Sequence, residues 1–427
     1  MTSRESPTDL PPHPFLFLVL NLPYGASAGF VTVTLAYLLS REGISTEKIA
    51  GIVALALFPM TWQFLWAPIV DTILGRKTWY LIGVVLMAVG VAASGFVQSN
   101  RDGLALLSAF VLLSSVGSTL VAMSIQTLIA HHTPDHRKGR ASGWYQAGNL
   151  GGTGLGGGAA LWIAEHIPPA WIAAVALAGA FMVCALALAW IPQTTSPGTS
   201  TSGGVNFGGL LREQYARLTM VLKSLWSLAR SRHGYLGLLI VFLPIGTGAA
   251  SNLWAAVADS WRAPADTVAL VNGVLGGVAS LIGCLIGGQL CDRMDRKFAY
   301  VFFGALQALS AVAMGLAPQT ESMFIFFTLT YALLNGTAYA SYSAVALEAV
   351  GWNAAATQYN AYASLANIPV LYMGLVDGWA YTRFGPSGML YAEALIALAA
   401  IIVFFTASTA TKGLQPRPAT STPRDTV

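Results

Sequence analysis

Charged residues are scarce in this chain of 427 residues. Only 9% are Asp, Glu, Lys or Arg, whereas soluble domains carry about 25%. Hydrophobic residues make up 55% of the chain, and several apolar runs exceed the roughly 20 residues that cross a bilayer as a helix. These runs show no strand-type alternation, which argues against a membrane barrel. The sequence therefore predicts an all-α integral membrane protein.

Cysteine is also rare, and the motifs of common enzymes are absent. Cys184, Cys284 and Cys291 lie within or at the ends of apolar runs, so they indicate neither a disulfide framework nor a metal site. The sequence contains no Walker A motif and no His-Glu-x-x-His motif. We therefore expect no enzymatic activity, no cofactor and no metal. Residues 1–14 lack the basic and apolar segments of a cleaved signal peptide.

The apolar runs predict twelve membrane spans in two groups of six. The expected spans are Phe15–Leu39, Ile49–Val70, Thr78–Val97, Leu104–Ala130, Ala141–Ala164, Ala170–Ile191, Tyr235–Ala258, Thr267–Leu290, Phe298–Leu316, Met323–Val350, Ala356–Tyr381 and Met389–Thr406. They divide the chain into a tail (1–14), a first bundle (15–192), a linker (193–234), a second bundle (235–408) and a second tail (409–427). Within the linker, residues 210–232 read as a basic amphipathic helix at the membrane surface.

The distribution of basic residues predicts the orientation. Most of the 22 Lys and Arg residues fall on the side that holds both termini and the linker, and none falls inside a span. The positive-inside rule then places both termini in the cytoplasm. The net charge of +4 follows from this topology, and it does not indicate nucleic-acid binding.

One short pattern occurs once in each half of the chain. A span ends in an acid, and a hairpin with an Arg-Lys pair follows. The first copy contains Asp71, Gly75, Arg76 and Lys77, and the second contains Gly288, Asp292, Arg293, Arg296 and Lys297. The repeat predicts two related halves.

This repeat resembles the loop signature of the major facilitator superfamily. The resemblance implies a monomeric secondary transporter with two pseudo-symmetric six-helix halves in an inner membrane, working by alternating access. It also implies that the repeated residues form a gating latch between the cytoplasmic ends of the halves, in which each carboxylate binds a neighbouring helix amino terminus. The implied gating residues are Asp71, Arg76, Lys77, Asp292, Arg293, Arg296 and Lys297.

Three further elements resemble the AmpG-type muropeptide permeases and acetyl-CoA transporters. They are Phe64–Asp71, Gly157–Trp162 and Ala356–Tyr359. The resemblance implies an anhydromuropeptide or related cell-wall glycopeptide as substrate, imported with protons. The region Ser118–Ser124 lacks the acids that those relatives carry in the fourth helix, so their role is missing or relocated here. A siderophore, a drug-like or other amphiphilic solute, and a non-transporting sensor on the same fold are the alternatives.

Polar and aromatic residues inside the spans are the candidates for substrate contact. Amides and phenols offer hydrogen bonds, and aromatic rings offer stacking faces, although some of these residues will serve helix packing instead. The candidates are Asn21, Tyr24, Tyr145, Asn149, Asn252, Trp254, Tyr331, Asn335, Tyr339, Gln358 and Tyr362. No Lys or Arg stands at membrane depth, which favours a neutral or amphiphilic solute over acetyl-CoA.

Three acids within the spans are candidates for proton coupling, because a buried carboxyl group binds protons readily. They are Glu348, Asp377 and Glu393, and Arg383 is close enough along the chain to pair with Asp377. Glycines recur at four-residue spacing in several spans, for example Gly25 with Gly29, and this spacing predicts close helix packing.

Overall fold

The computed structural model describes residues 15–72, 74–97, 101–133, 138–192, 241–291, 293–349 and 364–412, together with residues 13, 219, 223 and 239. All regular elements in this part of the chain are helices. The expected amphipathic helix over 210–232 lies outside the described residues, apart from two isolated positions.

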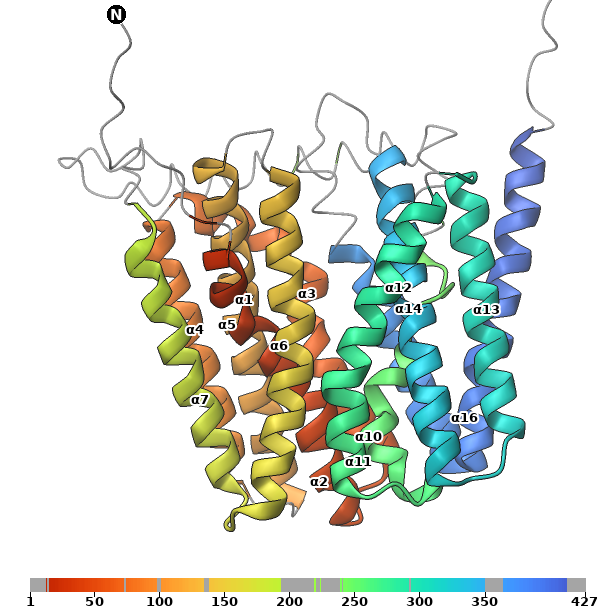
Figure 1. Cartoon of the computed structure of the whole chain (residues 1–427), viewed down its shortest axis with the longest axis horizontal. Coiled ribbons are helices and arrows are strands. Elements are labelled where there is room, and N and C mark those ends of the chain that lie inside the picture. The colour runs from red at the N-terminus through yellow and green to blue at the C-terminus, as the bar shows by residue number, and fades with distance from the viewer. Residues whose placement is uncertain are drawn as a thin grey trace, which may run out of the picture.

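The first half of the chain forms one group of helices, drawn from red to yellow in Figure 1. Its first span contains a π-helical segment, η1, between two α-helical parts. The elements are α1 (Phe15–Gly29), η1 (Phe30–Leu35), α2 (Ala36–Arg41), α3 (Thr46–Thr72), α4 (Arg76–Ser94), α5 (Arg101–His132), α6 (Lys138–His166), α7 (Trp171–Ala185) and η3 (Leu186–Trp190).

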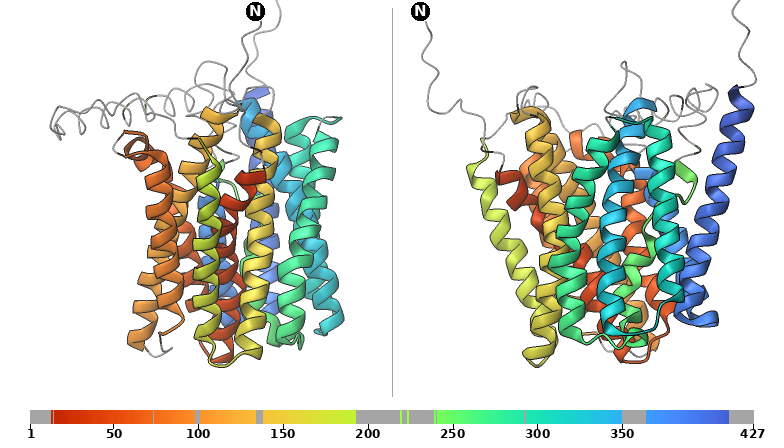
Figure 2. Two further views of the ribbon diagram at one scale, coloured as in Figure 1. Left: turned by 60° about the vertical axis from the view of Figure 1, so that its left-hand side comes forward. Right: turned by 45° about the vertical axis from the view of Figure 1, so that its right-hand side comes forward.

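The second half forms a second group beside the first, drawn from green to blue (Figure 1), and Figure 2 shows the same helices from two other directions. It also contains a π-helical segment, η6. The elements are η4 (Ala249–Leu253), α10 (Trp254–Val257), η5 (Ala258–Trp261), α11 (Ala265–Val268), η6 (Ala269–Leu275), α12 (Gly276–Cys291), α13 (Arg296–Leu316), α14 (Glu321–Ala349) and α16 (Asn367–Lys412).

Eight segments of the described chain are long and apolar enough to cross a membrane. One of them, Asn367–Ser408, covers part of the eleventh expected span and all of the twelfth, and these form two limbs of α16. The limbs meet at Gly385, whose φ of +72° suits glycine because it has no Cβ. Pro386 follows, and the two residues together turn the chain back through the bundle.

The seventh expected span, Tyr235–Ala258, is not a continuous helix in its described part. Residues 243–248 are non-helical, and short helices follow from Ala249 onward. Pro244 removes a backbone donor, while Gly246 and Gly248 adopt positive φ angles of 63° and 66°. The described part of the seventh span is therefore interrupted near its middle. Such a break at membrane depth requires other groups to satisfy the freed backbone.

Two tyrosine hydroxyls satisfy carbonyl groups at this break. Tyr300 on α13 donates to the carbonyl oxygen of Ile245 at 2.6 Å, and Tyr372 on α16 donates to that of Phe242 at 2.9 Å. Neighbouring helices thus supply the hydrogen bonds that a continuous helix would have made for itself.

Glycines bring α1 and α6 into close backbone contact, as their spacing predicted. A Cβ on Gly25 would lie 2.0 Å from the carbonyl oxygen of Asn149, and one on Gly29 would lie 2.0 Å from that of Thr153. Real Cβ atoms do not approach so closely, so only glycine allows this packing. Gly283 makes the same kind of contact between α12 and α14.

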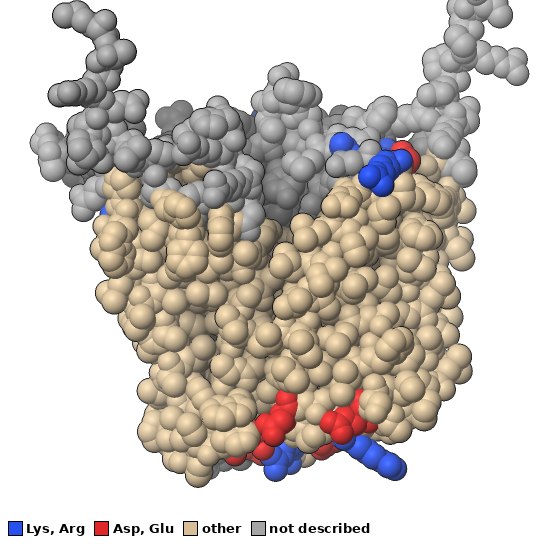
Figure 3. Space-filling model, viewed as in Figure 1, with Lys and Arg blue, Asp and Glu red and all other residues tan. Residues whose placement is uncertain are grey.

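The molecule has two ends, separated by a band without charged side chains on the face shown in Figure 3. The start of α1 and the end of α16 lie at one end, here called the terminal end, and the α2–α3, α6–α7 and α13–α14 connections lie at the opposite end (Figure 1). On the face shown in Figure 3, charged side chains gather at the two ends and the band between them carries none. This pattern is that of a membrane-spanning protein.

Candidate functional site

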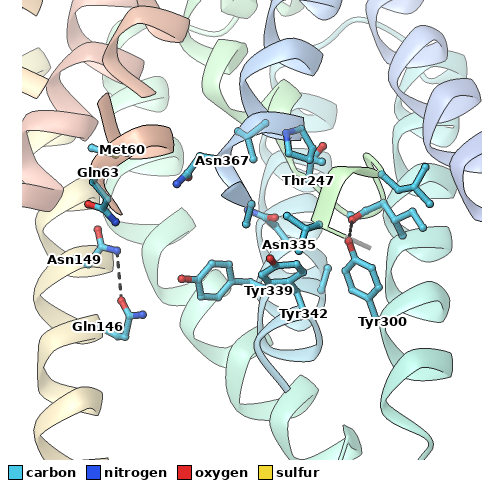
Figure 4. A pocket seen from close by; sticks show the side chains of 18 of the residues that line it. Met60, Gln63, Gln146, Asn149, Thr247, Tyr300, Asn335, Tyr339, Tyr342 and Asn367 are labelled. Carbon is cyan, nitrogen blue, oxygen red and sulfur yellow. Dashed lines mark hydrogen bonds between the residues drawn. The ribbon is translucent and has the colours of Figure 1, made fainter. Parts of the chain in front are cut away.

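A cavity of about 230 Å³ lies between the two halves. Side chains from both groups of helices line it, and Figure 4 shows Gln63, Gln146 and Asn149 facing Asn335 and Tyr339 across it. None of the described residues that line the cavity is charged. Amides, phenols and apolar groups therefore make up its walls, as expected for a site that binds an uncharged polar ligand.

Five of the residues expected to contact substrate line this central cavity. They are Tyr24, Tyr145, Asn149, Asn335 and Tyr339. Tyr339 is 54% exposed, although it lies well inside α14. Its ring therefore borders open space instead of packing in the core, which is the arrangement a stacking contact requires.

Several lining residues were not expected from the sequence. They are Met60, Gln63, Gln126, Gln146, Thr247, Tyr300, Tyr342 and Asn367, among others. The three glutamines could have been found, because an amide inside an apolar run is the same signal that selected Asn149. Tyr300 and Thr247 could not, since their position depends on the break in the seventh span.

Other predicted contacts lie away from the central cavity. Asn21 is fully buried, and its amide nitrogen donates to the backbone oxygen of Tyr145 at 2.8 Å. Asn252 lines a separate small pocket between α3 and α16. Trp254 is 2% exposed and packs edge-on against Tyr331, with ring centres 5.4 Å apart. Asn21 and Trp254 thus contact neighbouring helices inside the core, and Asn252 faces another pocket. Gln358 and Tyr362 lie outside the described residues.

The two halves make direct contact toward the opposite end. Ser40 donates to the carbonyl oxygen of Ala256 at 2.6 Å, and the backbone N–H of Glu47 donates to Thr382 at 3.2 Å. Gly378 packs on α3, where an added Cβ would lie 2.4 Å from the Cβ of Ala50. We call these contacts the seal.

One ion pair and one histidine–carboxylate contact lie beside the seal. The guanidinium of Arg383 is 3.7 Å from the carboxylate of Glu47, and the ring of His166 is 3.8 Å from the carboxylate of Asp266. Each of these contacts joins one half to the other. Arg383 also stacks on Trp379, so its described contacts are with these residues and not with Asp377, the partner expected from the sequence.

The central cavity lies on the terminal side of the seal. On α3, Ala50 contacts the other half while Met60 and Gln63 line the cavity. On α16 the order is reversed, as it must be for an antiparallel helix: Asn367 and Val370 line the cavity, and Gly378 contacts α3. The molecule is therefore closed toward the opposite end, with its cavity toward the terminal end.

Two of the three candidate acids for proton coupling are buried. Asp377 is fully buried and neither of its carboxylate oxygens has a hydrogen-bond partner, while Glu393 is 5% exposed. One oxygen of Glu393 accepts hydrogen bonds from the Tyr331 hydroxyl and the Ala250 N–H. The side chain of Glu348 lies outside the described residues.

The expected latch is described only in part. Lys77 donates to the carbonyl oxygen of Ile191 within its own half, and Arg293 and Arg296 are exposed beside Lys297, which is partly buried. Arg76 has a partly buried side chain. The side chain of Asp71 and the whole of Asp292 lie outside the described residues, so the latch stays a prediction.

Comparison with known proteins agrees with this architecture. The chain is 25% identical to the anhydromuropeptide permease of Escherichia coli (strain K12) over 387 residues, covering 86% of this chain and 74% of that protein. A bacterial homologue of the human lysosomal transporter Spinster, solved in an inward-facing and unoccupied conformation, superposes with a TM-score of 0.71 at 14% identity over 97% of this chain and 100% of that one. A D-xylose–proton symporter superposes with a TM-score of 0.68 at 16% identity. The superposition covers 94% of this chain and 99% of the symporter.

The family match covers most of the chain. Residues 17–373 match the Major Facilitator Superfamily, and the solved neighbours share its fold. The predicted all-α transporter fold is thereby confirmed, and so is the expectation that the protein is not an enzyme. The chain belongs to the Major Facilitator Superfamily.

Proposed function

We propose that this transporter carries an anhydromuropeptide or a related cell-wall glycopeptide by alternating access, and that it imports it together with protons. The observation that supports this most directly is an uncharged polar cavity between the halves in a chain that resembles an anhydromuropeptide permease over 86% of its length. Sugar hydroxyls and peptide groups pair with amide and phenol side chains, and sugar rings stack on tyrosines.

We also propose that the terminal end faces the cytoplasm. The prediction rests on the excess of Lys and Arg near the termini and linker. In that orientation the seal is on the external side, and the structure corresponds to the inward-facing state. The cavity, at about 230 Å³, is below the 300–1,000 Å³ typical of sites for drug-sized ligands. A disaccharide-peptide would need the cavity to widen, which opening of the terminal end provides.

Counterflow in proteoliposomes tests the proposal. Purified protein is reconstituted with an unlabelled anhydromuropeptide inside, and uptake of the labelled compound is measured. Asn335→Ala removes one cavity amide, so we expect the half-saturating concentration to rise about two- to tenfold, the value of one net hydrogen bond. Asn252→Ala is the matched control, because Asn252 lines a different pocket. Counterflow with a siderophore or another amphiphile, and none with any anhydromuropeptide, would refute the substrate assignment.

A further inference from the structure

A second, much smaller cavity lies next to the central one, inside the second half. It offers about 10 Å³ of space, which is room for one water molecule at most. Gln307 from α13, Tyr331 from α14 and Glu393 from the second limb of α16 line it, together with Pro244, Gly246 and Thr247 of the broken seventh span. The cavity is therefore lined by residues of one half alone.

Two polar side chains at this cavity have buried atoms without a hydrogen-bond partner of normal geometry. Gln307 is 3% exposed, and neither atom of its amide group has a hydrogen-bond partner of normal geometry, although the Tyr331 hydroxyl is near enough to interact with it. The second carboxylate oxygen of Glu393, Oε2, is also without a partner. Buried polar atoms are almost always satisfied, and leaving one unsatisfied costs about 1–3 kcal/mol. The cavity thus lacks a group that both side chains could bind.

We propose that this cavity is a proton site, in which a proton bound to Glu393 Oε2 is shared with the amide oxygen of Gln307, directly or through one water. The inference rests on the proposed function and names the residue at which its proton coupling takes place. The step is a simple transfer: in the outward-facing state, hydronium in external water protonates the carboxylate to a carboxylic acid. After the halves rearrange, the acid releases this proton to cytoplasmic water in the central cavity, which restores the carboxylate.

The hydrogen-bond donors around Glu393 favour binding of a proton over binding of a metal cation. The oxygen Oε1 already accepts hydrogen bonds from the Tyr331 hydroxyl and the Ala250 N–H. A cation site requires converging acceptor oxygens, whereas these two neighbours are donors. Protonation of Oε2 instead creates the donor that the Gln307 oxygen lacks.

The other titratable groups near Glu393 are Tyr331 on α14 and Asp377 on the first limb of α16. Asp377 is fully buried on the other side of the bend in α16, and neither of its carboxylate oxygens has a hydrogen-bond partner. Helix α13 contributes the neutral Gln307, and η4 contributes a backbone N–H.

The proton site and the central cavity are lined by the same short backbone segment. Gly246 and Thr247 line both cavities. A Cβ on Gly246 would lie 3.4 Å from the amide oxygen of Gln307, and one on Gly248 would lie 2.4 Å from the amide oxygen of Asn335. A ligand that moves Asn335 in the central cavity therefore presses on the segment that separates it from Glu393. This contact gives substrate and proton a physical route to influence each other.

The test compares Glu393→Gln with Glu321→Gln, a matched change at an exposed acid. Infrared difference spectra of the purified protein between alkaline and acidic pH report protonation of buried carboxyl groups without any substrate. We expect the wild type and Glu321→Gln to share a carboxylic-acid band that Glu393→Gln lacks. The same band in all three proteins would overturn the proton site.

Transport provides the second measurement. A one-unit pH gradient supports about tenfold accumulation of a neutral substrate carried with one proton. We expect Glu393→Gln to lower the accumulation, measured as the ratio of the inside to the outside substrate concentration, to about one. Counterflow by the same variant should remain measurable, which shows that it is folded. The double variant Gln307→Glu/Glu393→Gln moves the acid across the cavity, and we expect it to recover accumulation.

Several results would contradict the inference, and they differ from failure of the proposed function. Accumulation by Glu393→Gln at the wild-type ratio would overturn it, as would wild-type accumulation that needs sodium and ignores the pH gradient. If the wild type shows no counterflow with any anhydromuropeptide, the proposed substrate is wrong. The infrared band still tests Glu393 in that case.

Discussion

The seal makes a testable claim about the balance between conformations. Gly378 lies on α16 against α3, where a Cβ would be 2.4 Å from the Cβ of Ala50 and 3.0 Å from the carbonyl oxygen of Thr46. Carbon atoms in contact are normally about 3.5–4.0 Å apart, so Gly378→Ala requires the halves to separate by about 1 Å at this point. The strain exists only while the seal is closed.

The expected magnitude follows from the cost of overpacking. An extra methyl group in a well-packed contact costs about 1–3 kcal/mol, which corresponds to a population shift of about 5- to 150-fold. For a protein whose seal is closed 99 times in 100, 2 kcal/mol would leave about one molecule in four open. Replacing glycine by alanine also stabilises a helix by about 1 kcal/mol, but it does so in both conformations.

Gly374 provides the matched control. It lies one turn earlier on the same helix, and a Cβ there would have no atom within 4 Å. Gly374→Ala therefore receives the helix stabilisation without the clash. We expect the two variants to differ in conformational balance and to be similar in expression.

Electron paramagnetic resonance distances between the halves measure the effect. Spin labels at Glu42 and Gln319, both exposed at the opposite end, are introduced after the native cysteines are replaced by serine. Gly378→Ala should add a longer-distance component that Gly374→Ala lacks. Identical distance distributions in the two variants would refute the role assigned to the seal.

Three further predictions concern the break, the ion pair and the latch. Tyr300→Phe leaves the Ile245 carbonyl without its 2.6 Å hydrogen bond, so the free energy of unfolding should fall by about 1–3 kcal/mol; an unchanged denaturation midpoint would contradict this. Arg383→Gln breaks an exposed ion pair with Glu47. The free energy of unfolding should fall by at most about 1 kcal/mol, and this difference from the wild type should disappear in high salt. Asp292→Asn should favour the inward-open state, which cysteine probes on the cytoplasmic side will detect as increased labelling.

The sequence was sufficient for the fold because the relevant signals are long and repeated. Apolar runs, the clustering of basic residues and the Asp71/Asp292 repeat each predict a feature that spans the chain. The close packing of α1 on α6 was also predictable, because glycines four residues apart lie on one helix face. These arguments need only the periodicity of a helix and the thickness of a membrane.

The site was predicted less completely because lining a cavity depends on helix rotation and depth. Asn335 and Tyr339 were found, but Asn252 and Trp254 lie elsewhere because the seventh span breaks before them. Proline and glycine are tolerated in membrane helices, so Pro244 did not by itself indicate the break. The hydroxyl groups that stabilise the break belong to Tyr300 and Tyr372, which are distant along the chain. A local sequence pattern cannot reveal them.

Glu393 illustrates the same limit. The sequence places it in the last span, where it would be expected at the edge of the bundle. The turn of α16 at Gly385 brings it back against α14 and the broken span, where it is buried beside Tyr331. Its surroundings therefore follow from long-range packing that no spacing along the chain expresses.

The π-helical segment η1 has a consequence for the length of the first span. A π-helical turn accommodates one more residue than an α-helical turn, and each residue rotates an α-helix by about 100°. A chain with one residue fewer between Phe30 and Leu35 could form an unbroken α-helix, but α2 would then turn by about that angle. Ser40 would face away from Ala256, its partner in the other half. The length of this segment thus sets which face of α2 meets the second half, so natural relatives that keep this contact should keep the extra residue.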